Sequence, residues 1–234
     1  MHIGILKAGE PPGALRSYVG TYPAMIRAVL GDSYCYTEFD VVRSAPPDRE
    51  YWPDAFIITG SASGVHDEDP WIERFVEWLR ELDPGLPLIG ICFGHQIMAE
   101  AYGGLIGRSP NGWSGGLREY VVESREPWME HVPRFTLPVA HQDQVIVQPP
   151  FSTVVASNVF CPFAALSYRK RQAISFQGHP EFSREYARML IEHYQRTGLI
   201  SVAAANQAMT SLIGPDDCGR IAQWLKTFLI NESK

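Results

Sequence analysis

Residues 88–96 read LIGICFGHQ, an apolar run that reaches a cysteine held between Gly90 and Gly94. The pattern G-x-C-x-G between a strand and a helix is typical of a nucleophile elbow, a sharp turn that lifts one side chain above the edge of a sheet. The N-terminus of the next helix favours a thiolate, because its dipole and unpaired N–H groups stabilise negative charge. Cys92 is therefore a candidate nucleophile, although free cysteines are also commonly small buried residues.

Apolar runs and amphipathic segments alternate on both sides of this turn. Strands are expected at residues 2–7, 36–42, 55–59 and 86–92, and helices at residues 18–30, 71–82 and 95–102. This order predicts an α/β fold with a single doubly wound, mostly parallel sheet and helices on both faces. Ligands of such sheets bind at the carboxyl ends of the strands, where the glycine turns at Gly60 and at residues 90–94 both fall.

The second half of the chain has a different pattern. Between residues 106 and 174, short β-type runs are separated by proline and glycine, which predicts a smaller antiparallel extension. Helical spacing returns at residues 184–196 and 221–230. Because no repeat or linker divides the chain, we expect one domain over residues 1–234, with a motif-bearing core at about 3–195 and a C-terminal helical extension at about 200–234.

The composition excludes several classes of function. The net charge of −6 does not suggest the basic face that nucleic-acid backbones require, so no nucleic-acid partner is expected. No apolar stretch has the length of a membrane span and no secretory signal is evident, so we expect a cytoplasmic protein without a membrane partner. The four cysteines include no C-x-x-C pair, and no metal-binding motif is present, so neither a metal nor a cofactor is expected.

His179 is the best candidate for a base among the seven histidines. It follows the strand-like run at residues 173–177 and precedes Pro180 and Glu181. In extended geometry, residues two apart point the same way, so Glu181 can accept a hydrogen bond from His179 and fix its tautomer. A nucleophile, a base and a group that orients the base are the parts of a catalytic triad. His95, inside the predicted helix after Cys92, is expected to pack or cap.

GICFGHQ at residues 90–96 and FQGHPE at residues 176–181 together resemble the paired signature of the class I, triad-type glutamine amidotransferases. The resemblance extends to IITGSASGV at residues 57–65, DPWI at 69–72, NGW at 111–113 and HQDQV at 141–145. Within the family, the chain is most similar to stand-alone proteins that resemble the glutaminase domain of GMP synthetase. The resemblance implies the flavodoxin-like fold of this family.

The resemblance also implies a reaction. Cys92 would attack the side-chain amide of glutamine to form a γ-glutamyl thioester, with release of ammonia and then, after hydrolysis, of glutamate. His179 would carry the proton to the departing nitrogen and Glu181 would orient His179. The backbone N–H groups of Gly60 and Phe93 map onto the oxyanion hole of the family.

Further residues of this chain occupy positions that contact bound glutamine in the family. They are Gln96, Ala140, His141 and Asp143. Two of the matched positions depart from the common pattern: Phe93 stands where many members have leucine or tyrosine, and Ala140 stands where synthetase-linked domains have serine. The second departure suggests that the backbone of glutamine is held differently, or that the substrate differs.

Three functions remain open from the sequence. The first is an amidotransferase subunit that passes ammonia to a separate acceptor protein, a synthetase. The second is a partner-independent γ-glutamyl peptidase acting on γ-glutamyl peptides or conjugates, and the third is a non-catalytic binding or regulatory protein. Only about forty residues follow Glu192 and no GxxxxGK[ST] phosphate loop is present, which favours independence from an attached synthetase. The intact triad argues against the third function.

Overall fold

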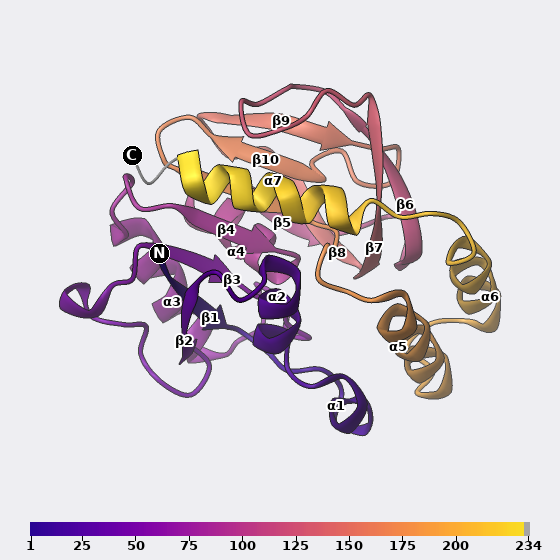
Figure 1. The fold of residues 1–234 in the computed structure, drawn as a ribbon. Coiled ribbons are helices and arrows are strands. Elements are labelled where there is room, and N and C mark those ends of the chain that lie inside the picture. Colours follow the sequence, from indigo (N-terminus) through magenta and orange to yellow (C-terminus); the bar gives the residue numbers. More distant parts are fainter. Residues whose placement is uncertain (232–234) are drawn as a thin grey trace.

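A nine-stranded sheet forms the centre of the molecule in the computed structural model, which describes residues 1–231 (Figure 1). One part is parallel, in the order β2 (Cys35–Asp40), β1 (His2–Lys7), β3 (Ala55–Ile58), β4 (Leu88–Ile91) and β11 (Ala173–Phe176). The sheet continues with antiparallel strands β10 (Ala165–Tyr168), β9 (Ser152–Ser157), β6 (Ser114–Val122) and β7 (Arg134–His141). The predicted α/β class, with a parallel sheet and an antiparallel extension, is confirmed.

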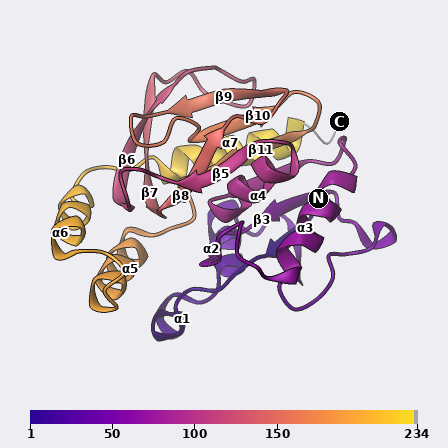
Figure 2. The ribbon, with the colours of Figure 1, turned by 180° about the vertical axis from the view of Figure 1, so that it is seen from behind.

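Helices cover both faces of this sheet (Figures 1 and 2). One face carries α2 (Tyr22–Leu30) and α7 (Cys218–Asn231), and the other carries α3 (Pro70–Glu81) and α4 (Phe93–Ala101). Beside β6 and β7 lie α5 (Arg184–Arg196) and α6 (Val202–Ser211), whereas α1 (Gly13–Val19) contacts α5. The remaining elements are a short 3-10 helix (Arg49–Tyr51) and a two-stranded sheet of β5 (Leu105–Arg108) and β8 (Asp143–Val147).

Each face of the sheet has its own apolar core, because side chains alternate along every strand. On β1, Ile3 and Ile5 belong to the core beneath α2 and α7, whereas Leu6 belongs to the core beneath α3 and α4. On β3, Ile57 belongs to the core beneath α2 and α7, and Ile58 belongs to the core beneath α3 and α4. Strands buried on both faces explain the nearly continuous apolar runs in the sequence.

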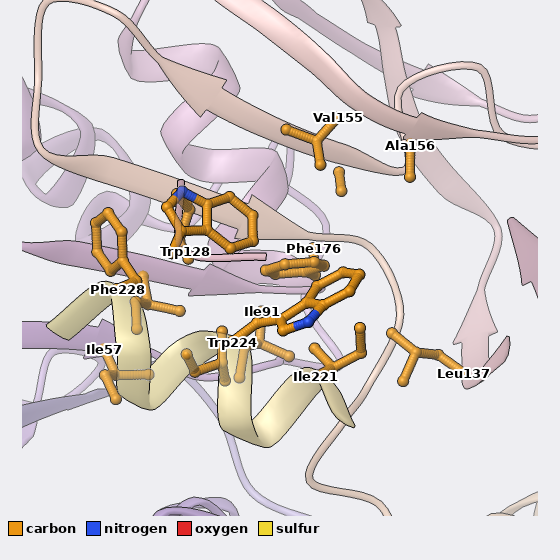
Figure 3. Packing of buried hydrophobic residues seen from close by; sticks show 14 of the residues in the cluster. Ile57, Ile91, Trp128, Leu137, Val155, Ala156, Phe176, Ile221, Trp224 and Phe228 are labelled. Carbon is orange, nitrogen blue, oxygen red and sulfur yellow. The ribbon is translucent and has the colours of Figure 1, made fainter. Parts of the chain in front are cut away.

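The last helix is part of the main core. Trp224 of α7 packs edge-on against Trp128 with ring centroids 6.0 Å apart, and Phe228 packs against the same indole at 6.3 Å (Figure 3). Trp128 in turn contacts Phe176 at the end of β11. The predicted C-terminal helical extension thus corresponds to α6 and α7, and its final residues 232–234 lie outside the described residues. The single-domain organisation stays a prediction.

The helix predicted at residues 18–30 is wrong in one respect, because two helices replace it. Gly20 has a φ of 76° and ends α1, with its N–H donating to the carbonyl of Arg16 at 3.0 Å. Thr21 then begins α2, and its hydroxyl accepts a hydrogen bond from the N–H of Ala24 at 3.2 Å. A left-handed glycine followed by a threonine cap interrupts the apolar periodicity that the two helices share.

No helix within residues 1–231 combines the length and the apolar character needed to cross a bilayer.

Removing the Trp224 side chain tests whether α7 is integral to the fold. Trp224 is only 2% exposed, so Trp224→Ala leaves a large cavity and should lower the free energy of unfolding by about 3–5 kcal/mol. Urea unfolding followed by circular dichroism measures this loss. Gln223→Ala, an exposed change on the same helix, should alter stability by less than about 0.5 kcal/mol. Equal stability of the two variants would contradict the placement of α7.

Candidate active site

Cys92 stands at the N-terminus of α4 in a strained backbone conformation. Its φ is 54° and its ψ is −101°, values that cost a non-glycine residue about 1–3 kcal/mol. The N–H of Cys92 donates to the carbonyl of Phe176 at 2.8 Å, and the carbonyl of Cys92 accepts from the N–H of Gln96 at 3.0 Å. Hydrogen bonds on both sides therefore hold this residue in the geometry of a nucleophile elbow.

The two glycines of the elbow provide space rather than an unusual φ. A β-carbon on Gly90 would lie 2.4 Å from Sδ of Met98 and 2.6 Å from the carbonyl oxygen of Gly94. A β-carbon on Gly94 would lie 2.6 Å from the carbonyl oxygen of Ile58. The two glycines thus permit the turn by letting α4 approach β3 and β4 closely, and Cys92 itself carries the backbone strain.

His179 and Glu181 lie together beside Cys92, as their spacing predicts. Nδ1 of His179 is 2.8 Å from Oε1 of Glu181, and the two side chains are 4% and 2% exposed. The backbone N–H of His179 donates to the carbonyl of Pro138 at 2.9 Å, which ties this turn to β7. Cys92 lies close by as well, since a β-carbon on Gly60 would be 3.1 Å from Cε1 of His179 and 3.8 Å from Cβ of Cys92. The structure thus brings the three predicted triad residues into contact in the expected order.

Opposing effects act on the charge of His179. Burial favours the neutral ring, but the Glu181 carboxylate and the Cys92 sulfur outweigh it and raise the pKa of His179 above its ordinary value. Because Glu181 faces Nδ1, the other ring nitrogen is the one available to Cys92. The arrangement therefore favours an imidazolium that can donate a proton next to the sulfur.

Phe182 supports the imidazole in a way that the sequence did not reveal. Its ring lies parallel to that of His179, with centroids 3.7 Å apart and an interplanar angle of 11°. Tyr186 packs on Phe182 edge-on at 4.6 Å. An aromatic face next to a cationic ring is favourable, and it restricts rotation of the imidazole. Only its position directly after the FQGHPE motif could have indicated this contact.

A buried amide contacts the sulfur from another direction. Nε2 of Gln177 lies 3.6 Å from Sγ of Cys92, and Oε1 of Gln177 accepts from Nε2 of Gln96 at 3.2 Å. The same nitrogen of Gln96 donates to the carbonyl of Asp143 at 2.7 Å. The Nε2 group of Gln96 is thus committed within the protein. Sequence reasoning missed Gln177, although it lies within the motif.

The predicted oxyanion donors lie next to the triad. A β-carbon on Gly60 would lie 3.1 Å from Cε1 of His179 and 3.8 Å from Cβ of Cys92, so only glycine fits without displacing the imidazole. The N–H of Gly60 donates to no other backbone group within the part of the chain that the structure describes. Phe93 is the first residue of α4, where an N–H has no intrahelical acceptor.

The remaining predicted substrate contacts gather at the end of β7. Nδ1 of His141 is 3.1 Å from the carbonyl oxygen of Asp143, and burial lowers the pKa of His141 to about 3. Asp143 lies 3.9 Å from Nε of Arg108, and Ala140 is half-buried. A neutral His141 serves as a fixed polar group rather than as a proton carrier.

Other candidate groups are placed away from this chemistry. Nδ1 of His95 lies 2.8 Å from Oγ of Ser175, and burial lowers the pKa of His95 to about 3, so this ring packs as expected. Burial raises the pKa of Cys161 to about 12, whereas Cys35 is exposed. Among residues 1–231, no group of three or more histidine, cysteine or acidic side chains is arranged to hold a metal ion.

Comparisons with known proteins identify the family of this chain. The family model for glutamine amidotransferase class-I matches residues 21–193. A glutamine amidotransferase-like protein of Schizosaccharomyces pombe is 30% identical over 98% of this chain and 98% of its own length. Gamma-glutamyl peptidase 3 of Arabidopsis thaliana is 29% identical over 84% of this chain and 83% of its own.

More distant relatives and solved structures also include glutamine amidotransferases and glutamine-hydrolyzing proteins. A GMP synthase of Caldanaerobacter subterraneus is 27% identical to this chain. The match covers 71% of this chain but only 32% of the length of that enzyme. The crystal structure of a glutamine amidotransferase from Thermotoga maritima superposes with a TM-score of 0.72 at 17% identity, covering 100% of this chain and 98% of that one. The fold is therefore shared, and the matched family model places this chain in the class I glutamine amidotransferase family.

Proposed function

We propose that this protein is a cysteine-dependent hydrolase of γ-glutamyl amides, with glutamine or another γ-glutamyl small molecule as substrate. One observation carries the proposal: the buried His179 contacts both Glu181, at 2.8 Å, and Cys92 on its strained turn. A nucleophile, a base and an orienting carboxylate in this order are the parts needed for acyl transfer. A nucleophile beside a base that is itself paired with a carboxylate supports catalysis over a purely binding or regulatory role.

In the first half of the reaction, Sγ of Cys92 attacks the γ-carbonyl carbon. The carbonyl oxygen becomes an oxyanion, which the N–H groups of Gly60 and Phe93 receive; one such donor contributes about 3 kcal/mol of transition-state stabilisation. The C–N bond then breaks as His179 gives its proton to the departing nitrogen. Ammonia or an amine leaves, and a γ-glutamyl thioester remains on Cys92.

In the second half, water hydrolyses the thioester. His179, now neutral, accepts a proton from the water as its oxygen attacks the same carbonyl carbon. The C–S bond breaks, glutamate leaves, and the imidazolium next to the sulfur is restored. Glu181 keeps Nδ1 protonated throughout, so the opposite ring nitrogen carries both proton transfers.

Two fates of the released nitrogen have specific support. Gamma-glutamyl peptidases 3 and 5 of Arabidopsis thaliana each match 84% of this chain, which supports a partner-independent γ-glutamyl peptidase. A glutamine-hydrolyzing GMP synthase subunit of Methanococcus maripaludis is 29% identical over 48% of the chain, which supports a glutaminase that delivers ammonia to a separate synthetase. The peptidase function has the support of relatives that match more of the chain.

Replacing the nucleophile tests the proposal directly. Cys92→Ala should abolish glutamate release from glutamine and from γ-glutamyl peptides, and should prevent labelling by a diazoketone analogue of glutamine. Glutamate assay and intact-protein mass spectrometry measure both effects. Cys35→Ala, which changes an exposed thiol, should retain activity and labelling. Hydrolysis retained by the Cys92 variant would end the proposal.

His179 and Glu181 should differ in their effect on turnover and on its pH dependence. His179→Ala should lower kcat by about 10³-fold, and Glu181→Ala by less, because orienting a base contributes less than being one. The Glu181 carboxylate raises the pKa of His179. In the wild type, His179 therefore keeps the proton that the leaving nitrogen needs up to a higher pH. In Glu181→Ala the pKa of His179 falls, and the alkaline limb of kcat should move to lower pH. An unmoved limb would assign Glu181 another role.

A substrate panel separates the two fates of the nitrogen. Purified protein is incubated with glutamine and with γ-glutamyl dipeptides, and glutamate release is measured without any added protein. Rapid hydrolysis of dipeptides is expected, with kcat/KM for the best dipeptide at least about tenfold above that for glutamine. Faster hydrolysis of glutamine than of every dipeptide would favour the synthetase-linked function instead.

A further inference from the structure

The turn that contains Gly60 begins where β3 leaves the sheet. Strands β1 and β3 pair in parallel, and the last pair of their register is Leu6 with Ile58 (Figure 1). The N–H of Thr59 still donates to the carbonyl of Leu6 at 3.1 Å. In a regular parallel ladder, the next hydrogen bond would run from the N–H of Ala8 to the carbonyl of Thr59. The peptide between Thr59 and Gly60, which carries the Gly60 N–H, would then lie in the sheet.

A side chain replaces that carbonyl. The N–H of Ala8 donates to Oγ1 of Thr59 at 3.0 Å, and the carbonyl of Thr59 accepts from no backbone N–H within residues 1–231. Threonine hydroxyls offer the backbone this alternative to a regular ladder. The connection between the two strands is therefore kept, whereas the peptide between Thr59 and Gly60 is released from the sheet and its N–H is free to face the site.

The same hydroxyl also holds the far side of Gly60. Oγ1 of Thr59 donates to the carbonyl of Gly60 at 2.9 Å, so the hydroxyl serves once as an acceptor and once as a donor. Thr59 is only 1% exposed, so bulk water does not compete for these hydrogen bonds. One anchored side chain thus fixes the peptide after the Gly60 α-carbon and keeps the peptide before it out of the ladder.

Gly60 needs this support because it is a glycine. A β-carbon at this position would lie 3.1 Å from Cε1 of His179, so the site excludes a larger residue. Glycine has the widest choice of backbone conformations, and an unsupported glycine turn does not fix the direction of its N–H. The end of β1 packs on this turn, since a β-carbon on Gly9 would lie 2.8 Å from Cα of Ser61. The hydroxyl of Thr59 adds the hydrogen bonds that tie the turn to β1.

We propose that Thr59 is a positioning residue, whose hydroxyl replaces the carbonyl of its own peptide in the ladder and so directs the N–H of Gly60 at the carbonyl oxygen of the substrate. This role rests on the proposed function, in which that N–H receives the oxyanion. The oxyanion forms only as the sulfur attacks, so a well-placed donor stabilises the transition state more than the bound substrate. Loss of the hydroxyl therefore lowers kcat and leaves KM nearly unchanged.

Thr59→Val tests this role, because valine keeps the shape of threonine without the hydroxyl. Glutamate release is measured from glutamine and from γ-glutamylalanine, which form the same oxyanion. On whichever of them the wild type hydrolyses, kcat should fall by about 10- to 100-fold with KM within about threefold. Alkylation of Cys92 by iodoacetamide forms no oxyanion, so its rate should stay within about threefold of the wild type. Thr37→Val, the control, removes a hydroxyl 2.8 Å from Nε2 of His2 on the edge strand β2 and should change neither rate.

A second pair of variants serves if valine unfolds the protein, as circular dichroism would reveal. Thr59→Ser and Thr59→Ala differ only in the hydroxyl, and serine should give a kcat at least about tenfold above that of alanine. Equal kcat values for this pair would overturn the proposed role, and so would a Thr59→Val variant with the kcat of the wild type. Equal losses of kcat and of alkylation rate would assign the hydroxyl to the fold of the whole site and would also overturn it. Wild-type protein without any Cys92-dependent release of glutamate would instead overturn the proposed function.

Discussion

The close contact between α4 and the strands beneath it is the constraint on which the site depends. With β-carbons at Gly90 or Gly94, atoms of the helix and strand would come within 2.4–2.6 Å, so neither position accepts a larger residue without separating the two elements. This contact forces the chain to reverse within Cys92, which takes up a φ of 54°. The strain is offset by the packing of two apolar cores, one on each face of the sheet. The core beneath α2 and α7 includes Cys92 itself. Packing energy thus maintains a reactive geometry that local preference opposes.

Charge inside the site follows from burial. Glu181 is 6% exposed, and its second oxygen has no hydrogen-bond partner among the described residues, so the cation of His179 is its main compensation. A buried carboxylate with one partner strongly favours the protonated form of that partner. The imidazolium in turn stabilises negative charge on the sulfur. In the proposed reaction this charge moves to the carbonyl oxygen, which the N–H groups of Gly60 and Phe93 would receive.

Local spacing was sufficient to predict the parallel half of the sheet and the proximity of Cys92, His179 and Glu181, because each motif lies where a strand ends. Local spacing did not predict contacts between distant segments. Gln177 meets Cys92 only because β11 pairs with β4. The break at Gly20 was hidden because α1 and α2 share one apolar periodicity. The role of Glu181 as an orienting group stays a prediction.

The fate of the nitrogen is decided by what surrounds His179 rather than by the triad. Attack on a γ-glutamyl carbonyl is the same step whether ammonia or an amino acid departs, so Cys92, His179 and Glu181 do not distinguish the two. A group attached to the nitrogen must fit beside the base, where Phe182 already covers one face of the imidazole with ring centroids 3.7 Å apart.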